Sequence, residues 1–329
     1  MASQTPSLFL DDNNAKEAPG KEGAILDDPG VDSQLRAMWS NFQPYADGNF
    51  VARMRASARG LRDNQVPGSA RSEAYFLFHR CWWEMYVGCA LLEQGVQLVP
   101  RAQWDNSWKG AGPDLMATID GLRVWIECVA PGPGDGADAV PELTDGLLDD
   151  VPLHQISLRF LSVIEGKRKT WAGYMTKGIV KAQDGFVVAI NAHGVPLTFL
   201  SGNRPLILNS LYGLGDQAIT YNRTTKEWSE PFLKRRLFIP KLKGEAIDAN
   251  LFGNGKAAEV SGVLYSTVDA WHPKSTPALG VLFVHNLTAA VPLPDRWLPQ
   301  SVSYAVTVNG ARGTIERSDV QAAVAAARL

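Results

Sequence analysis

The sequence predicts an α/β fold whose core follows the order helix, three strands, helix, strand. A helical pattern of apolar residues covers 71–94, a β-hairpin pattern covers 112–130, and a second helical pattern at 153–176 precedes the continuous apolar run at 186–191. Short helical patterns precede this core, and scattered strand patterns follow it. We therefore expect an α/β core with an N-terminal helical extension and a C-terminal β-rich extension.

Length and composition are typical of a globular protein that keeps its cysteines reduced. The chain has 329 residues, of which 45% are hydrophobic, so it can form one large domain or two ordinary ones. Its three cysteines lack the spacing of a zinc site, which favours a cytoplasmic location. No apolar run is long enough to span a membrane, and the N-terminus lacks the pattern of a secretion signal.

The charge balance limits how nucleic acid could be bound. A net charge of −2 provides no general attraction to phosphates, so such binding must depend on local basic patches. Two runs qualify as candidates, although runs of this kind are often only solvated surface. They consist of Lys167, Arg168 and Lys169, and of Lys234, Arg235 and Arg236.

The segments before the core comprise a polar arm and two short helices. Residues 1–30 are rich in Asp, Gly, Pro and Asn, which predicts a solvated arm. The stretches 31–42 and 50–61 have helical spacing. The helix at 71–94 contains no Pro and a single Gly, Gly88, and Gly95 is placed to end it. We assign 1–70 to an N-terminal extension that precedes this helix.

The hairpin at 112–130 has a register that its turn determines. Asp120-Gly121 is a preferred two-residue hairpin turn, because both central positions of a type I′ turn require positive φ. Each step away from the turn adds one residue to each strand, so opposed pairs follow by counting. One face is then wholly apolar and should face the core. It carries Leu115, Ala117, Ile119, Leu122, Val124 and Ile126.

The other face of the hairpin carries two opposed carboxylates. The same count places Asp114 opposite Glu127, Met116 opposite Trp125 and Thr118 opposite Arg123. Like charges in such positions destabilise a sheet, and a hard divalent cation such as Mg²⁺ would convert the repulsion into ligation. Asp114 could instead be an ordinary strand-edge residue after Pro113, or the two acids could point to solvent.

The remaining elements are predicted with less detail. We expect a strand at 96–102, a long loop at 131–150, and strands at 261–267, 280–284 and 303–308, with a final helix at 318–329. The core then occupies 71–200, and 201–329 forms a mixed α/β extension that can pack on the core as one domain.

The α-β-β-β-α-β order and the motif within it resemble the PD-(D/E)XK nuclease superfamily, the restriction endonuclease-like proteins. That motif reads Pro-Asp, a variable gap, then Glu, one residue and Lys, and here Pro113-Asp114 lies on the second strand and Glu127 on the third. A Glu on the first helix often joins the metal site, and Glu84 matches it. The resemblance covers roughly 71–193 and implies a restriction-endonuclease-like core with a mixed sheet.

The chain departs from the family pattern at one position. Val129 stands two residues after Glu127, where the family has its Lys. Some members of the superfamily carry this Lys on another element, and the helix at 153–176 offers Lys167 or Lys169 for the role. If neither reaches the acids, the resemblance implies a catalytically inactive relative.

The resemblance implies a set of metal ligands and a reaction. Asp114 and Glu127 would bind Mg²⁺ or Mn²⁺ with the backbone carbonyl of Cys128, and Glu84 would contribute through its side chain or a water. Lys167 would stabilise charge on the phosphodiester. Glu84 could alternatively pair with Arg80 on its own helix.

These features together predict a metal-dependent endodeoxyribonuclease that acts in the cytoplasm and takes part in restriction or defence. A homodimer would suit paired cuts on two strands. The alternative is a catalytically inactive nuclease-fold protein that binds nucleic acid or acts as a scaffold. A third interpretation is an enzyme of another phosphoester, such as RNA or a nucleotide.

Overall fold

A computed structural model describes residues 28–63, 73–105, 112–142, 151–200, 204–309 and 312–318. Most of the predicted arm at 1–30 and nearly all of the predicted helix at 318–329 lie outside the described residues. Ser318 itself ends a strand, so a helix does not begin there.

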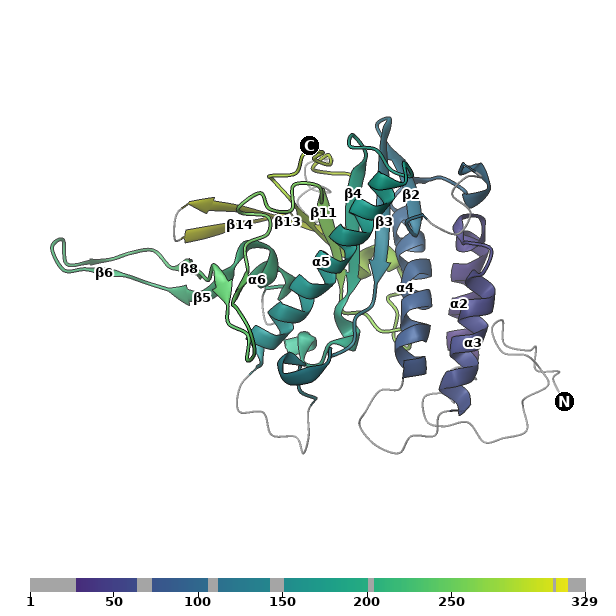
Figure 1. Ribbon diagram of the computed structural model, residues 1–329, viewed down its shortest axis with the longest axis horizontal. Coiled ribbons are helices and arrows are strands. Elements are labelled where there is room, and N and C mark those ends of the chain that lie inside the picture. Colours follow the sequence, from purple (N-terminus) through teal and green to yellow (C-terminus); the bar gives the residue numbers. More distant parts are fainter. Residues whose placement is uncertain are drawn as a thin grey trace.

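A ten-stranded mixed sheet forms the centre of the described chain (Figure 1). Strands β3, β4 and β11 run parallel, β12 and β13 also run parallel, and the other neighbours are antiparallel. Strands after residue 200 therefore continue the sheet that the hairpin begins. In spatial order the strands are β1 (Gln97–Leu98), β2 (Leu115–Ile119), β3 (Leu122–Val129), β4 (Gly185–Asn191), β11 (Gly262–Ser266), β12 (Leu282–His285), β13 (Val302–Asn309), β14 (Arg312–Ser318), β8 (Phe232–Arg235) and β5 (Leu214–Ala218).

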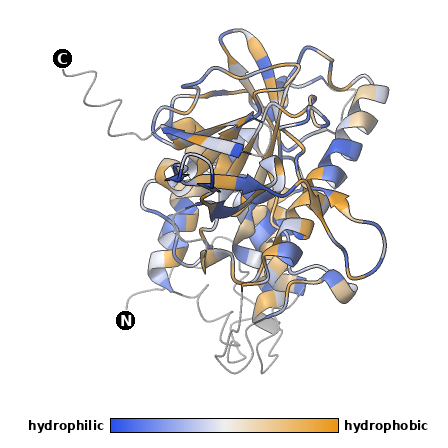
Figure 2. Cartoon of the chain, turned by 90° about the vertical axis from the view of Figure 1, so that its left-hand side faces the viewer, coloured by the Kyte–Doolittle hydropathy of each residue, from blue (hydrophilic) through white to orange (hydrophobic). Residues whose placement is uncertain are grey.

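Helices cover both faces of this sheet and divide the core into two clusters. One cluster joins the sheet to α4 (Glu73–Glu93), with α2 (Pro29–Phe42) and α3 (Phe50–Asp63) packed outside α4 (Figure 1). The other joins the opposite face to α5 (Leu153–Thr176) and α6 (Ile207–Tyr212). In Figure 2 the helices alternate between hydrophilic and hydrophobic bands, as expected for helices with one buried face.

The predicted hairpin register is confirmed along β2 and β3. Asp120 and Gly121 have φ of 50° and 81°, as a type I′ turn requires. The predicted apolar face packs into the α4 cluster. The observed pairs are Leu115 with Ile126, Met116 with Trp125, Ala117 with Val124, Thr118 with Arg123 and Ile119 with Leu122.

The two long helices are anchored to the sheet by aromatic side chains. On α4, the indole N–H of Trp83 donates to the carbonyl of Ala189 in β4 at 2.9 Å. On α5, the ring of Trp171 stacks on Phe186 of the same strand, with centroids 4.4 Å apart. Gly88 lets α2 approach α4 closely, because a Cβ there would overlap the Phe42 ring. These contacts set how each helix lies across the strands that carry the acids.

Several predicted elements differ from the structure. The strand expected at 96–102 is reduced to β1 and is followed by a 3-10 turn at Arg101–Gln103, because Pro100 lacks the N–H that would continue the pairing. Helix α6, strands β5 to β10 and strand β14 were not predicted. They include two small ladders, of β6 (Tyr221–Asn222) with β7 (Glu227–Trp228) and of β9 (Phe238–Ile239) with β10 (Ile247–Asp248).

Candidate functional site

The four residues proposed as catalytic lie together at the end of the hairpin away from its turn. Glu84 comes from α4, Asp114 immediately precedes β2, Glu127 lies in β3 and Lys167 lies in α5. Electrostatic interactions link Glu84 to Asp114, and Asp114 to both Glu127 and Lys167. Elements from both faces of the sheet thus contribute to one cluster of charges.

Glu127 is buried and receives a donor from α5 on each carboxylate oxygen. The side chain is 4% exposed, and Lys167 Nζ lies 2.6 Å from its Oε2. The Tyr174 hydroxyl donates to its Oε1 at 2.9 Å and also lies 3.3 Å from the carbonyl oxygen of Gly112. Lys167 and Tyr174 are seven residues apart, which places them on one side of the helix two turns from each other.

Asp114 is held by backbone contacts instead of extending the strand pairing. The paired ladder ends with Leu115 and Ile126, so the expected rung of Asp114 opposite Glu127 is not formed. The Asp114 carboxylate turns toward β3 and accepts the N–H of Cys128 at 2.7 Å. Arg101 fixes the backbone before β2 by donating to the carbonyls of Pro113 and Asp114 at 2.9 and 3.2 Å.

The electrostatics of Asp114 show a shortage of positive charge beside it. Burial of the carboxyl and the nearby Glu127 raise its pKa to about 7. Lys167, the Cys128 N–H and Arg53 oppose this rise without cancelling it. The Asp114 carboxyl is therefore harder to ionise than that of a solvent-exposed aspartate.

Glu84 is similarly destabilised as an anion. Burial and the Asp114 carboxylate raise its pKa to about 8, although Arg53 counteracts them. Its Oε2 lies 3.2 Å from a guanidinium nitrogen of Arg53 in α3, which also pairs with Asp47. The N-terminal helical extension thus supplies the partner of Glu84, which the sequence alternative assigned to Arg80.

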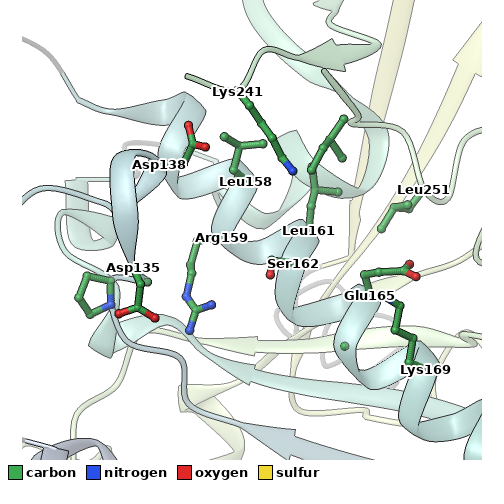
Figure 3. A pocket seen from close by; sticks show the side chains of 14 residues that line it. Asp135, Asp138, Leu158, Arg159, Leu161, Ser162, Glu165, Lys169, Lys241 and Leu251 are labelled. Carbon is green, nitrogen blue, oxygen red and sulfur yellow. The ribbon is translucent and has the colours of Figure 1, made fainter. Parts of the chain in front are cut away.

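Lys167 remains charged in this environment. Burial disfavours its ammonium, but Glu127 and Asp114 outweigh that effect and raise its pKa. The alternative lysine, Lys169, lies elsewhere: it lines a pocket of about 720 Å³ between α5 and the segments near Asp138 and Lys241 (Figure 3). Of the two candidates for the missing motif lysine, Lys167 is the one that reaches the acids.

Val129 has the position but not the chemistry of the motif lysine. It lies two residues after Glu127 in β3 and so shares its side of the strand. The partly buried side chain packs against the hydrophobic cluster beneath α5. An apolar residue can occupy this position because Lys167 of α5 supplies the ammonium instead.

The other residues of the two predicted basic runs are not gathered around the acids. The Arg168 guanidinium is engaged by Glu165 at 2.7 Å, Glu259 at 2.5 Å and the Lys256 carbonyl at 2.5 Å, contacts that give it a structural role. Lys234, Arg235 and Arg236 belong to or follow β8, near the end of the sheet opposite the hairpin. They cannot contact the same phosphate as Lys167.

The structure also limits the metal ligands. No group of three or more His, Cys, Asp or Glu side chains within the described ranges is placed to hold a metal ion. The expected set of Asp114, Glu127 and Glu84 is therefore not assembled, and each acid is held by protein donors.

No helix within the described residues is long and apolar enough to cross a membrane.

Three residues at the site were not identified from the sequence. Tyr174 could have been found, because it recurs on the same side of the helix as Lys167. Arg53 and Arg101 had no comparable signal, since Arg53 reaches Glu84 from another helix and Arg101 reaches the backbone before β2 across the intervening residues.

Comparisons with family models, with curated proteins and with solved structures find no match to this chain.

Proposed function

We propose that the chain is a metal-dependent nuclease that hydrolyses DNA phosphodiester bonds at Asp114, Glu127 and Lys167. The observation that carries the proposal is the 2.6 Å contact between Lys167 Nζ and Glu127 Oε2. This contact places an ammonium on Glu127 and close enough to act on Asp114, the two acids of the Pro-Asp and Glu motif. Lys167 thus supplies the charge of the motif lysine, although Val129 occupies that lysine's position on β3. The order α4-β1-β2-β3-α5-β4, with β3 parallel to β4, also agrees with a restriction-endonuclease-like core.

A hard divalent cation would have to share Asp114 and Glu127 with the protein donors that now hold them, and the electrostatics of the acids supports such an ion. The raised pKa values of Asp114 and Glu84 reflect buried negative charge that a cation would neutralise. Asp114 and Glu127, with the Cys128 carbonyl, are the residues that would hold Mg²⁺ or Mn²⁺. When bound, such an ion lowers the pKa of a water and neutralises charge on a phosphoryl oxygen.

The chain's own residues account for the rest of the proposed chemistry. Hydrolysis forms one P–O bond to the water oxygen and breaks one P–O ester bond, leaving a phosphate monoester and an alcohol. The charged Lys167 would stabilise the negative charge that grows on the phosphoryl oxygens. Tyr174 would keep Glu127 oriented, and Arg101 would keep Asp114 at the start of β2.

The test is incubation with plasmid, linear duplex, single-stranded DNA and RNA in Mg²⁺, in Mn²⁺ and in EDTA, with Asp114→Ala and Glu127→Ala in parallel. We expect metal-dependent cleavage of DNA by the wild type and at least a 100-fold loss in both variants. Cleavage of RNA alone would assign the site to another phosphoester.

Val129 favours one other function, that of a catalytically inactive module that binds nucleic acid. Absence of cleavage by the wild type on all four substrates, together with retained DNA binding, would establish that function instead.

A further inference from the structure

A two-stranded ribbon projects from the end of the sheet opposite the acids. It begins with β5 and β8, continues through β6 and β7, and extends well beyond the rest of the molecule (Figure 1). Every residue from 219 to 228 is exposed. The ribbon therefore presents both of its faces to whatever lies beside the protein.

The tip of the ribbon carries aromatic side chains that are exposed to solvent. Trp228 is 65% exposed and Tyr221 is 45% exposed, and their rings form a cross-strand pair with centroids 4.9 Å apart. Ile219 beside them is 53% exposed. Large apolar side chains gathered at an exposed tip are typical of interaction sites.

The turn at the tip is held in one shape by its own hydrogen bonds. Asn222 Oδ1 accepts the N–H groups of Thr224 and Thr225, and the Asn222 carbonyl accepts the N–H of Lys226 at 2.8 Å. Lys226 has a φ of 60°, in the left-handed region that a non-glycine residue enters only when its surroundings hold it there. The tip is thus preorganised, which lowers the entropy lost on binding.

The ribbon is basic although the chain is slightly acidic. Residues 214–236 include five Lys or Arg and three Asp or Glu, a net charge of +2, whereas the whole chain has a net charge of −2. Arg236 at the base pairs with Asp216 of β5 at 3.6 Å. Arg223 and Lys226 flank the turn, and Lys234 lies at the base beside Arg312 of β14. At about 3.3 Å per residue, cations are spread over roughly 26 Å from tip to base.

We propose that this ribbon inserts into a groove of duplex DNA, with Arg223 and Lys226 on phosphates and the Tyr221–Trp228 pair against the groove wall. The proposal rests on the proposed function, since DNA is the partner in both. A two-stranded ribbon fits the major groove of B-DNA, which is about 12 Å wide. Cations along the ribbon are complementary to the phosphates that line that groove.

A second copy of the chain is the competing occupant, and charge disfavours it. Two such ribbons pairing with each other would bring their excess of Lys and Arg together, whereas DNA neutralises them. The ribbon lies far from the acids along the sheet, so it would hold DNA some distance from the bond that is cut.

The test measures DNA binding apart from cleavage. Anisotropy of a labelled 30-base-pair duplex is recorded in EDTA over a range of salt concentrations. Four full-length proteins are compared: the wild type, R223A/K226A, Y221A/W228A and the control R296A/K243A. The control removes the same charge from other exposed positions. Circular dichroism confirms that each is folded.

We expect R223A/K226A to reduce the slope of log affinity against log salt by about 1.8, from 0.9 per lost phosphate contact. Between 50 and 200 mM salt the wild type should then lose about 12-fold more affinity than this variant. Y221A/W228A should weaken binding without changing the slope, and the control should behave as wild type.

Two results would overturn the ribbon proposal. One is a salt slope that is the same in R223A/K226A, the control and the wild type. The other is a wild-type dimer in sedimentation that W228A converts to monomers, because the ribbon would then bind a second copy. Failure of the nuclease proposal is a separate result, in which DNA is bound through the ribbon but no variant or wild-type protein cleaves it.

Discussion

Replacing Lys167 with Met removes the ammonium from the acids while keeping much of the side-chain volume. Lys167 is 22% exposed and its partner Glu127 is 4% exposed, so the loss leaves a nearly buried carboxylate with Tyr174 as its remaining donor. Breaking a fully buried pair costs about 3 to 5 kcal/mol, and partial exposure of the lysine reduces this to about 2 kcal/mol.

The effect on cleavage should be larger than the effect on stability. Removing one donor that stabilises developing negative charge lowers turnover by about 10² to 10³. The assay is plasmid cleavage in Mg²⁺ by wild type, K167M and K169M, with urea unfolding of each protein. Lys169 is the matched control, because it lies two residues further along α5 and lines the pocket near Asp138 and Lys241, away from the acids (Figure 3).

The same variant has a second, pH-dependent consequence. Lys167 opposes the rise of the Asp114 pKa, so K167M should move that pKa further above about 7. Metal binding requires the carboxylate, and its pH dependence should shift upward in the variant. Equal cleavage by K167M and K169M, or an unchanged pH dependence, would refute the role assigned to Lys167.

Three further changes have defined outcomes. Because burial and Asp114 raise the Glu84 pKa to about 8, the folded protein holds this proton more tightly than the unfolded chain, and stability should fall as pH rises from about 5 to about 8. E84Q should flatten that fall in urea unfolding without metal, and an unchanged pH dependence of stability would contradict the assignment. Y174F should cost about 1 kcal/mol and lower cleavage about tenfold, whereas no loss of cleavage would show that Lys167 alone orients Glu127. In the background of K167M, V129K should restore part of the cleavage because it places an ammonium on the Glu127 side of β3, and a double variant as inactive as K167M would contradict this placement.

The parts of the fold predicted from the sequence depend on local signals. The Asp120-Gly121 turn determines every pair of the hairpin, and the apolar spacing of α4 and α5 determines their extents to within a few residues. The orientation of Asp114 does not follow from counting, because the ladder ends one residue earlier and the carboxylate takes a backbone N–H.

The parts that were missed depend on contacts between distant segments. Arg53 reaches Glu84 only because α3 packs on α4, and no pattern in either helix indicates that pair. The ribbon was missed because its residues are exposed on both faces, so they lack the alternation that a half-buried strand shows. The choice between Lys167 and Lys169 required the rotation of α5, which Trp171 fixes on Phe186.

The most direct measurement is anomalous diffraction from crystals of the wild type grown with Mn²⁺. We predict a manganese peak with one carboxylate oxygen each from Asp114 and Glu127 at about 2.0 to 2.6 Å, and Lys167 still within contact of Glu127. Crystals of similar quality that show manganese only elsewhere, with both carboxylates held as they are without it, would contradict the metal site on which the proposed hydrolysis depends.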